Sequence, residues 1–460
     1  MKKTIFLLMA FTVISFFIAC EKDDDEKEET TITEQINNTT TWTSDKEWIV
    51  EGIVEVGSML TIEPGTIVKF KEGSGLVVGS YTAGGIIANG TDEEPIIFTS
   101  AGSGKWGSIN LLEYNNSNST VFKYCTFNNA SDYAAVILSG TKAKFENCLF
   151  TNCSESAISV EYEGEFNGFW NNSISSCGSH PILIEANAVT TIDTGNVFNH
   201  SDGQWIKVTN NFDLTDDGTW KNLGIPYYIE HVLNIDADLV IEDSVTICFA
   251  PEAGLEIGYN NYASLKAIGT ENKMIRFTSA SFNPQPGDWQ DISFYSNNSA
   301  SASELSYCIF EYGGNLNDWG ILNLVETSIT MKNCIVKNSE HHGVVVDASA
   351  KFNECKNNTI SNCGSHPVSI ILEAVYTLDS SNTFIADEGF GIYITTYYSS
   401  VVTGNVTWQK FDIPYILQGD AGIGSNAELT LLPGTVLKFA PSTEFSVGLD
   451  NNSKLNAVGT

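Results

Sequence analysis

An eleven-residue segment occurs three times in this chain and sets the length of a much longer repeat. It reads LTIEPGTIVKF at residues 60–70, LVIEDSVTICF at 239–249 and LTLLPGTVLKF at 429–439. Repeats have to be identified before domains are counted, because repeat proteins do not follow the usual relation between length and domain number. We call these eleven residues the opening segment, and the three copies predict three tandem modules.

The later parts of the modules match more closely than the opening segments do. Residues 171–181 read NNSISSCGSHP, and residues 357–367 read NNTISNCGSHP. We therefore divide the repeat region into a first module at 41–218, a second at 219–406 and an incomplete third at 407–460. The third stops at a Gly-Thr pair that precedes a further strand in the other two modules, so we expect the sequence to be a fragment.

A shorter period inside each module predicts the fold class. Cys125 and Cys148 are 23 residues apart, and short stretches such as Lys142–Phe145 alternate polar with apolar residues between Asn, Gly and Ser turns. Helical periodicity is hard to find. A period of about 20–25 residues with several short strands is typical of a solenoid, in which neighbouring coils share one core.

These repeats resemble right-handed parallel β-helix proteins of pectate-lyase-like architecture. The resemblance covers residues 41–460 and rests on the opening segment, the Gly-Thr turn, the Phe-Thr-Ser strands at 98–100 and 277–279, and the Trp-x-x-Ile strands that begin at Trp106 and Trp289. It implies an all-β fold, a single-stranded right-handed parallel β-helix solenoid built from tandem modules. It implies no particular activity.

The N-terminus has the features of an export signal. Two lysines precede an apolar run at residues 5–17, which is too short to be a stable membrane anchor. A small residue followed by Cys20 resembles a bacterial lipoprotein cleavage box. The resemblance implies that residues 1–20 are a signal peptide and that Cys20 carries the lipid; the alternative is an ordinary secretory signal with a chance cysteine.

An acidic block follows Cys20, and we expect residues 21–40 to form a flexible tether, because a block dominated by one charge cannot pack. Lys22 followed by acidic residues resembles the export signal of lipoproteins displayed on the outer face of the outer membrane. We therefore expect the protein to be lipid-anchored in the outer membrane and to face the cell exterior. The alternative is that the block is only a solvated linker.

Charge and cysteine content limit the partners and the cross-links. The chain has 56 acidic and 23 basic residues and a formal net charge of −33, which disfavours binding to nucleic acid. Cysteines other than Cys20 are odd in number, which argues against a full disulfide framework. We expect them to be buried in stacked core positions. Those at matching places in two modules are Cys125 and Cys308, Cys148 and Cys334, and Cys177 and Cys363.

An enzyme has to be considered, because many proteins of this architecture cut acidic polysaccharides. Their lyases use a Lys or Arg base, and the only arginine of the chain is Arg276. Their hydrolases carry an Asp pair together with three other motifs. Here only Asp216-Asp217 is found, with His341-His342-Gly343 as the nearest approach to the His motif. We assign no catalytic residue.

A residue repeated in every module is interpreted as structural, because a solenoid enzyme usually has one active site. This interpretation covers His180 and His366, Trp106 and Trp289, and the turn residues Asn147, Asn172, Asn333 and Asn358.

Acidic and aromatic clusters supply the remaining binding candidates. Asp213, Asp216 and Asp217 are weak candidates for Ca²⁺, since the spacing does not match an EF-hand loop and an exposed acidic turn explains them. We therefore expect no cofactor. Other clusters are the acidic residues Glu161, Glu163 and Glu165, and the aromatic residues Tyr393, Tyr397 and Tyr398, which could stack on sugar rings.

Taken together, the sequence favours a lipid-anchored surface β-helix with a binding, adhesin-like or structural role, directed towards glycans. The alternative is an extracellular polysaccharide lyase or glycoside hydrolase whose site is not recognisable. A groove that holds a unique Lys, His or Tyr beside two carboxylates would favour the enzyme. Repeated aromatic side chains along one face would favour the binding protein.

Overall fold

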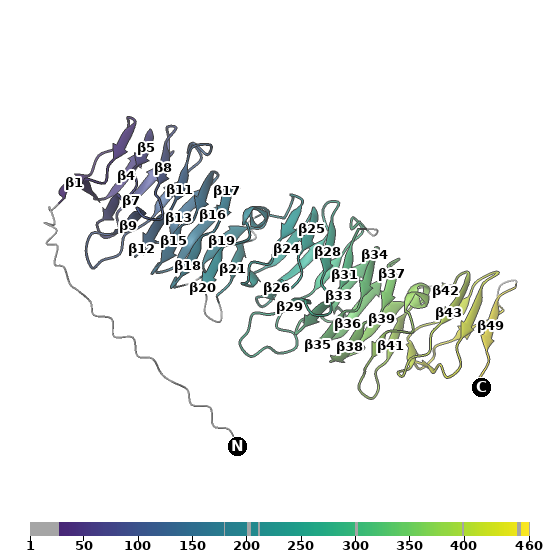
Figure 1. The fold of residues 1–460 in the computed structure, drawn as a ribbon. Helices are drawn as coiled ribbons and strands as arrows, with labels where there is room; N and C mark the ends of the chain where they lie inside the picture. Colours follow the sequence, from purple (N-terminus) through teal and green to yellow (C-terminus); the bar gives the residue numbers. More distant parts are fainter. Residues whose placement is uncertain are drawn as a thin grey trace, which may run out of the picture.

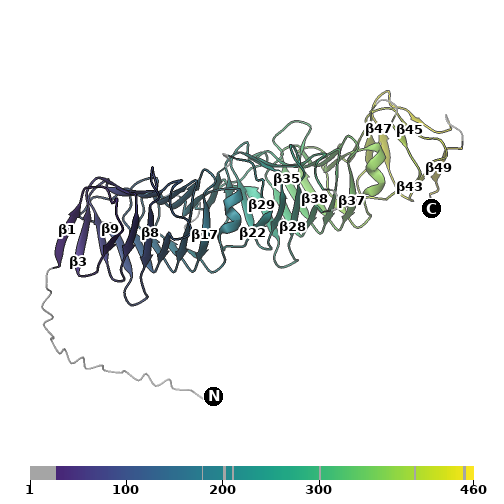
Figure 2. The same cartoon turned by 90° about the horizontal axis from the view of Figure 1, so that it is seen from above.

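The computed structural model describes residues 27–178, 180–199, 204–209, 212–299, 302–397, 400–448 and 452–459. The predicted signal peptide and Cys20 lie outside these residues. The described chain winds along one axis, with the N-terminal strands at one end and the C-terminal strands at the other (Figures 1 and 2). It forms a right-handed parallel β-helix of about 17 turns with about 24 residues per turn, as the sequence predicted.

Three sheets surround the core of the first module. Sheet I contains β1 (Glu28–Ile32), β3 (Lys46–Val50), β6 (Ile67–Phe70), β9 (Ile96–Ser100), β12 (Cys125–Asn128), β15 (Leu149–Thr151), β18 (Ser173–Ser175) and β20 (Val197–Asn199). Sheet II begins with β4 (Ile53–Val56), β7 (Gly75–Val78), β10 (Ile109–Leu111), β13 (Ala134–Ser139), β16 (Ser156–Glu161), β19 (Ile182–Glu185) and β21 (Ile206–Thr209). Sheet III contains β2 (Thr40–Trp42), β5 (Met59–Ile62), β8 (Gly85–Asn89), β11 (Val121–Lys123), β14 (Lys142–Glu146) and β17 (Glu165–Trp170).

The second module extends sheet II and adds two sheets. Sheet II continues with β23 (Tyr227–Ile229), β26 (Thr246–Phe249), β29 (Ile275–Ser279), β32 (Cys308–Glu311), β35 (Ile335–Ser339), β38 (Thr359–Cys363) and β40 (Thr383–Phe384). Sheet IV contains β22 (Gly218–Trp220), β25 (Asp238–Ile241), β28 (Ser264–Ile268), β31 (Glu304–Ser306), β34 (Ser328–Lys332) and β37 (Lys351–Lys356). Sheet V begins with β24 (Val232–Ile235), β27 (Gly254–Ile257), β30 (Ile292–Phe294), β33 (Gly320–Val325), β36 (His342–Asp347), β39 (Val368–Ile371) and β41 (Ile392–Thr395).

The third module extends sheet V in the same way. Sheet V continues with β44 (Tyr415–Leu417) and β47 (Leu437–Phe439). Sheet VI contains β42 (Val401–Val402), β45 (Ala421–Ile423) and β48 (Phe445–Ser446), and sheet VII contains β43 (Asn405–Trp408), β46 (Glu428–Leu431) and β49 (Lys454–Ala457).

One sheet runs across each module boundary, but a different strand of the coil contributes to it on the two sides of the boundary. β21 extends the sheet that begins with β4, yet it pairs in parallel with β23, which is the counterpart of β3 of sheet I in the second module. The pairing of β41 with β44 repeats this change at the second boundary. A 3₁₀ helix occurs just before each change, at η1 (Asn187–Thr191) and η2 (Leu372–Thr377). Equivalent sheets of successive modules therefore do not form one continuous face.

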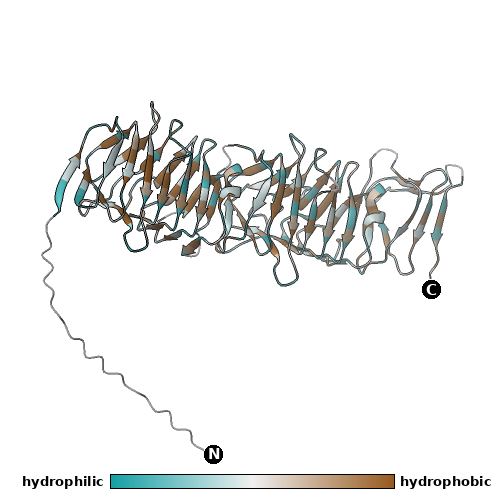
Figure 3. Cartoon of the chain, turned by 45° about the horizontal axis from the view of Figure 1, so that its top comes forward, coloured by the Kyte–Doolittle hydropathy of each residue, from teal (hydrophilic) through white to brown (hydrophobic). Residues whose placement is uncertain are grey.

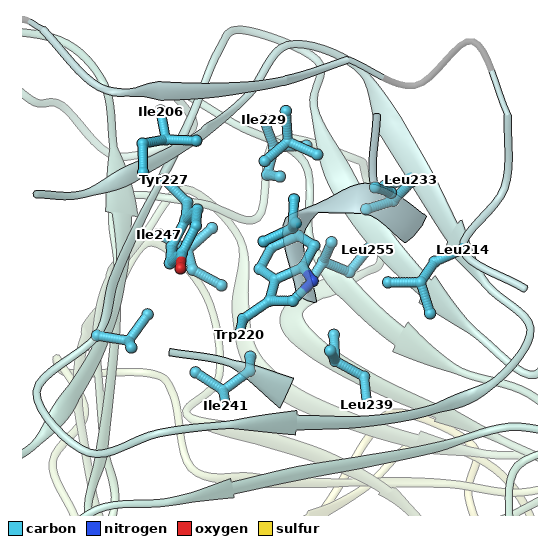
Figure 4. Packing of buried hydrophobic residues seen from close by; sticks show 14 of the residues in the cluster. Ile206, Leu214, Trp220, Tyr227, Ile229, Leu233, Leu239, Ile241, Ile247 and Leu255 are labelled. Atoms are coloured by element: carbon cyan, nitrogen blue, oxygen red, sulfur yellow. The ribbon is translucent and has the colours of Figure 1, made fainter. Parts of the chain in front are cut away.

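Alternation of inward and outward residues builds the core. In β3, β5 and β6 every second side chain is buried, as expected for strands with one buried face. Apolar strand positions alternate with hydrophilic turns along the length (Figure 3). Trp42, Trp220 and Trp408, which open the three modules, are almost fully buried. Figure 4 shows Trp220 among aliphatic side chains at the first boundary, beside the ring of Tyr227 at 5.3 Å.

Like residues stack on like residues in successive coils. The rings of Phe98, Phe127 and Phe150 stack at centroid distances of 4.9 and 4.6 Å. The cysteines at 125–363 are buried free thiols, as the sequence predicted for these described positions. Burial, and next the neighbouring Cys148, raise the pKa of the Cys125 thiol, so this thiol stays protonated and behaves as an apolar side chain.

Turn residues also stack. Gly65 and Gly434 of the opening segment have φ of 73° and 83°, and Ser244 adopts 63° at the equivalent place, so this segment contains a turn as predicted. Asn172 is buried and joins three coils: its Oδ1 accepts from the backbone N–H of Cys148 at 2.9 Å, and its Nδ2 donates to Asn196 Oδ1 at 3.1 Å. Asn358 makes the same bonds with Cys334 and Asn382.

The expected flexible tether at 21–40 is wrong for its described C-terminal part. β1 lies inside that range and pairs in register with β3, and Lys46 Nζ is 3.1 Å from Glu28 of β1. Ile36 is buried and forms a bridge with Val56. The acidic block ends at Glu29, and the Thr and Ile residues that follow favour a strand. The first coil therefore begins before residue 41.

Among the described residues, no helix is long and apolar enough to cross a membrane.

We predict that Asn172→Ala lowers the free energy of unfolding by about 2–4 kcal/mol, because it leaves the buried N–H of Cys148 without its partner and opens the ladder to Asn196. Urea unfolding followed by circular dichroism measures the change. Asn89→Ala, at an exposed position of β8, is the control and should change stability by less than about 0.5 kcal/mol. Equal losses for the two variants would contradict the structural role of the Asn ladder.

Candidate functional site

A cleft lies on the outer face of sheet V, where β36, β39 and β41 run side by side. Its volume is about 500 Å³. The polar and aromatic residues that line it are Asp318, His342, Asp347, Ser365, His366, Ser369, Tyr393, Thr395 and Tyr397. We call this cavity the His–Tyr cleft.

The centre of the His–Tyr cleft is a cluster of three rings from successive coils. His342 begins β36, His366 lies in the turn before β39, and Tyr393 lies in β41. The ring centroids are 5.6 Å apart for His342 and His366, 4.5 Å for His366 and Tyr393, and 6.0 Å for His342 and Tyr393. The pairing of β36 with β39 places His342 beside His366, whereas Tyr393 pairs with Ser369 and reaches the histidines with its ring.

The two imidazoles are buried and held in the neutral form. His366 Nδ1 accepts a hydrogen bond from the backbone N–H of Gly391 at 3.1 Å, and burial lowers its pKa. His342 is only 7% exposed, and burial, followed by the neighbouring His366, lowers its pKa to about 4. Its Nδ1 is buried and has no hydrogen-bond partner within the described residues.

Two carboxylates lie beside the three rings. Asp347, at the end of β36, accepts a hydrogen bond from the hydroxyl of Tyr397, and that bond raises the pKa of Tyr397. Asp318 precedes β33 and has φ of 65°, and its charge adds to the effect of burial in raising the pKa of Tyr393. The cleft therefore presents aromatic faces together with hydrogen-bond acceptors.

A second cavity begins on the other side of Tyr397. It has a volume of about 910 Å³, and its lining includes Lys351, Glu373, Tyr376 and Tyr397. Tyr397 is 55% exposed and lines both cavities. The hollow surface therefore extends from the His–Tyr cleft round the turn between β36 and β37 to η2.

The equivalent place in the first module is filled by aromatic rings. His180 corresponds to His366 and stacks on Trp205 and Tyr228, with 5.7 Å between ring centroids in each case. Trp205 stands where the second module has Gly391, and it stacks on Tyr228 at 4.9 Å. The repeat thus keeps the histidine but not the same surroundings.

The predicted acidic residues come together at the first module boundary. Asp213 and Asp216 line a cavity of about 650 Å³ with Glu163, Glu165 and Lys142. Asp217 does not line it; its Oδ1 accepts from the backbone N–H of Asp238 at 2.8 Å.

Local hydrogen bonds account for part of this arrangement. Asp213 Oδ1 accepts from Asn234 Nδ2 at 3.0 Å, and Asn187 Oδ1 accepts from the backbone N–H of Asp216 at 3.1 Å. Across the described ranges, no group of three or more His, Cys, Asp or Glu residues is arranged to hold a metal ion.

Arg276 has a structural environment. Its guanidinium pairs with Glu311, whose other carboxylate oxygen lies 3.0 Å from Lys337 Nζ. Burial would raise the pKa of Glu311, but Lys337 and Arg276 outweigh it and lower that pKa. The three residues form a charged ladder across β29, β32 and β35.

Sequence reasoning found part of the His–Tyr cleft. It singled out the unrepeated His342 and the aromatic residues Tyr393, Tyr397 and Tyr398, of which Tyr398 lies outside the described residues. It interpreted His366 only as a turn residue. It missed Asp318 and Asp347, which lie in separate coils and carry no motif. Trp106 and Trp289 are structural as predicted: both are fully buried, and their indole N–H groups donate to backbone carbonyls.

Two family models match the N-terminal part of the chain and agree with the fold. Residues 110–218 match the family described as right handed beta helix region, and residues 34–147 match the pectate-lyase like beta helix domain. A search of curated protein sequences found no match. Among solved structures, the catalytic domain of a GH87 alpha-1,3-glucanase in complex with tetrasaccharides aligns with 94% of this chain and 70% of its own, at 11% identity and a TM-score of 0.21.

We predict that His342 makes stability depend on pH. Its pKa in the folded chain is about 4, below the value of about 6.5 for an unperturbed histidine, so the unfolded state binds the proton more readily. The stabilising contribution is complete above about pH 6.5 and is lost as the pH falls towards about 4. Between about pH 7 and pH 5, the free energy of unfolding should fall by about 2 kcal/mol more for the wild type than for His342→Gln.

Urea unfolding at the two pH values measures this difference. His231→Gln is the control, because His231 is exposed, and it should keep the pH dependence of the wild type. The same pH dependence in His342→Gln as in the wild type would contradict the prediction.

Proposed function

We propose that this chain is a carbohydrate-binding β-helix protein displayed at the cell surface, and that the His–Tyr cleft is its ligand site. One observation carries the proposal: Tyr393, packed against the rings of His342 and His366, lines a cleft together with Asp318 and Asp347. A sugar ring has an apolar face and a rim of hydroxyl groups. The tyrosine ring suits the first, and the carboxylates suit the second.

The charge of the chain narrows the class of carbohydrate. The net charge is −33, and the cleft itself contains two carboxylates. Acidic sugars would be repelled at such a surface. An uncharged glycan is therefore the preferred ligand.

Features of the N-terminus support the proposed location of the protein at the cell surface. The apolar run at 5–17 followed by Cys20 supports lipid attachment, and the acidic block after Cys20 supports export to the cell surface. The long, rigid solenoid would then hold the cleft away from the membrane. An adhesin-like or spacer role is compatible with the same arrangement.

The same cleft also gives a reason to test for hydrolysis. It holds two carboxylates from separate coils, Asp318 and Asp347, and the second accepts a hydrogen bond from a tyrosine hydroxyl. Glycoside hydrolases use two carboxyl groups on either side of the scissile bond. A histidine and a tyrosine beside two carboxylates are also the arrangement expected for an enzyme from the sequence, so a glycoside hydrolase is the second candidate function.

We predict that Tyr393→Ala weakens binding of an uncharged oligosaccharide at least about tenfold, because a stacking face is worth about 1.4 kcal/mol or more. Tyr393→Phe keeps the ring and should bind within about threefold of the wild type. A glycan array selects the oligosaccharide, and isothermal titration calorimetry measures the affinity. Tyr133→Ala, which changes an exposed tyrosine outside the cleft, is the control.

Two outcomes would overturn this function. Unchanged affinity in Tyr393→Ala would remove the cleft as the ligand site. If the wild type releases shortened oligosaccharides from a polysaccharide and Asp347→Asn does not, the function is hydrolysis and not binding alone.

The membrane anchor has its own test. We predict that Cys20→Ser moves the protein from the membrane fraction to the soluble fraction, because the lipid would have no attachment site. Cell fractionation and immunoblotting measure the distribution, and Cys248→Ser, which changes a buried thiol, is the control. Membrane association that survives Cys20→Ser would contradict lipid attachment.

A further inference from the structure

One corner of the solenoid continues through both complete modules. In the first module it joins sheet II to sheet III, and in the second it joins sheet V to sheet IV. Hydrogen bonds between successive coils follow this corner: Tyr114 N to Gly79 O (3.0 Å), Asn115 Nδ2 to Thr141 Oγ1 (3.1 Å), Tyr162 N to Glu185 Oε1 (2.8 Å), Thr215 N to Asn187 Oδ1 (2.8 Å), Asp238 N to Asp217 Oδ1 (2.8 Å) and Asn261 N to Asp236 Oδ1 (3.0 Å).

Exposed aromatic side chains occur at regular intervals on this corner. Tyr114, Tyr162, Phe212 and Tyr259 are 53%, 61%, 45% and 55% exposed. They follow β10, β16, β21 and β27, and β13, β19 and β24 belong to the coils between them. The corner turns after β13, β19 and β24 contain no aromatic residue. From Tyr114 to Tyr259, aromatic side chains therefore stand on every second coil.

Further aromatic residues extend the row within the same corner. Tyr81 follows β7 and is 83% exposed, and Tyr262 follows Tyr259 and is 71% exposed. We call the six residues the aromatic edge. Other exposed aromatic residues, such as Tyr133 and Phe282, lie in turns elsewhere.

The structure holds members of the aromatic edge in place. Tyr162 and Glu163 have φ of 53° and 62°, which is unfavourable for residues other than glycine. The buried carboxylate of Glu185 accepts hydrogen bonds from both backbone N–H groups, at 2.8 and 2.9 Å, and stabilises this turn. Tyr259 packs edge-on against Tyr295 at 4.9 Å. The contact with Tyr295 restricts the Tyr259 ring, which therefore loses less conformational entropy on binding than a free side chain would.

The interval fits a polysaccharide. Neighbouring coils are separated by about 4.8 Å, so every second coil gives a spacing of about 10 Å. This is close to the length of two sugar rings in an extended chain. Successive aromatic faces could then contact every second sugar of one polymer.

The charges at the edge exclude an acidic polymer. Glu163, Asp213 and Asp216 line the cavity beside Tyr162 and Phe212, with Lys142 as the only cation of that described lining. Carboxylates repel uronates and sulfated sugars, but they accept hydrogen bonds from the hydroxyl groups of neutral sugars.

We infer that the aromatic edge is a second carbohydrate-binding surface, which binds one uncharged polysaccharide chain along the axis of the solenoid. It is separate from the His–Tyr cleft, and it shares with the proposed function only the class of ligand. Each aromatic contact is weak, and the contacts act together because they are joined by one polymer. The edge therefore selects long chains over short ones.

The test compares the wild type with the triple variant Tyr114→Ala/Tyr162→Ala/Tyr259→Ala. Affinity electrophoresis in gels that contain a soluble, uncharged glucan, and titration with a short oligosaccharide of the same sugar, measure the two kinds of binding. The triple variant should bind the polymer at least about a hundredfold more weakly and the short oligosaccharide as well as the wild type does. Tyr133→Ala/Phe282→Ala removes exposed rings outside the edge and should leave both unchanged.

These outcomes distinguish binding at the aromatic edge from binding at the His–Tyr cleft. Unchanged polymer binding in the triple variant, or an equal loss in the control, would overturn the proposal that the aromatic edge binds the polysaccharide. Loss of only short-oligosaccharide binding in Tyr393→Ala would support two separate sites. Stronger binding of a polyuronate than of the uncharged glucan would overturn the assignment of the ligand class. Circular dichroism of each variant confirms that the fold is intact.

Discussion

The whole structure depends on in-register stacking of parallel coils. Each strand pairs with the strands one coil before and after it, so a residue at a given point of one coil lies beside its counterpart in the next. The Phe98, Phe127 and Phe150 stack and the Asn172 and Asn196 ladder are direct results. So is the contact of His342 with His366 in the His–Tyr cleft, because β36 and β39 pair in register.

Coil length is the property that the sequence shows best. The interval between equivalent residues predicted the strands and the buried thiols, since these depend only on the repeat and on alternation along each strand. The change of sheet at β21 and β41 could not be predicted, because it depends on which strand β23 and β44 pair with. Charge density was misleading at β1, where the backbone pairing with β3 outweighs the repulsion between nearby carboxylates.

The candidate site was harder to predict than the fold for a physical reason. Asp318 and Asp347 enter the cleft from a loop and from a strand end, and neither position is fixed by the repeat. Their effect on the cleft depends on distance in space, which a single sequence does not contain. Tyr393 and Tyr397 were identified as aromatic residues suited to sugars, but only the coil stacking shows that Tyr393 belongs with two histidines.

Repetition separates structural from functional residues less cleanly than the sequence suggested. His180 and His366 are equivalent, and both stack on aromatic rings, so both have a structural role. His366 lies in the His–Tyr cleft beside Tyr393, whereas His180 is stacked on Trp205 and Tyr228. Equivalent residues of a solenoid can therefore have different surroundings in different modules. The unrepeated neighbours, rather than the repeated residue itself, then determine where a ligand can bind.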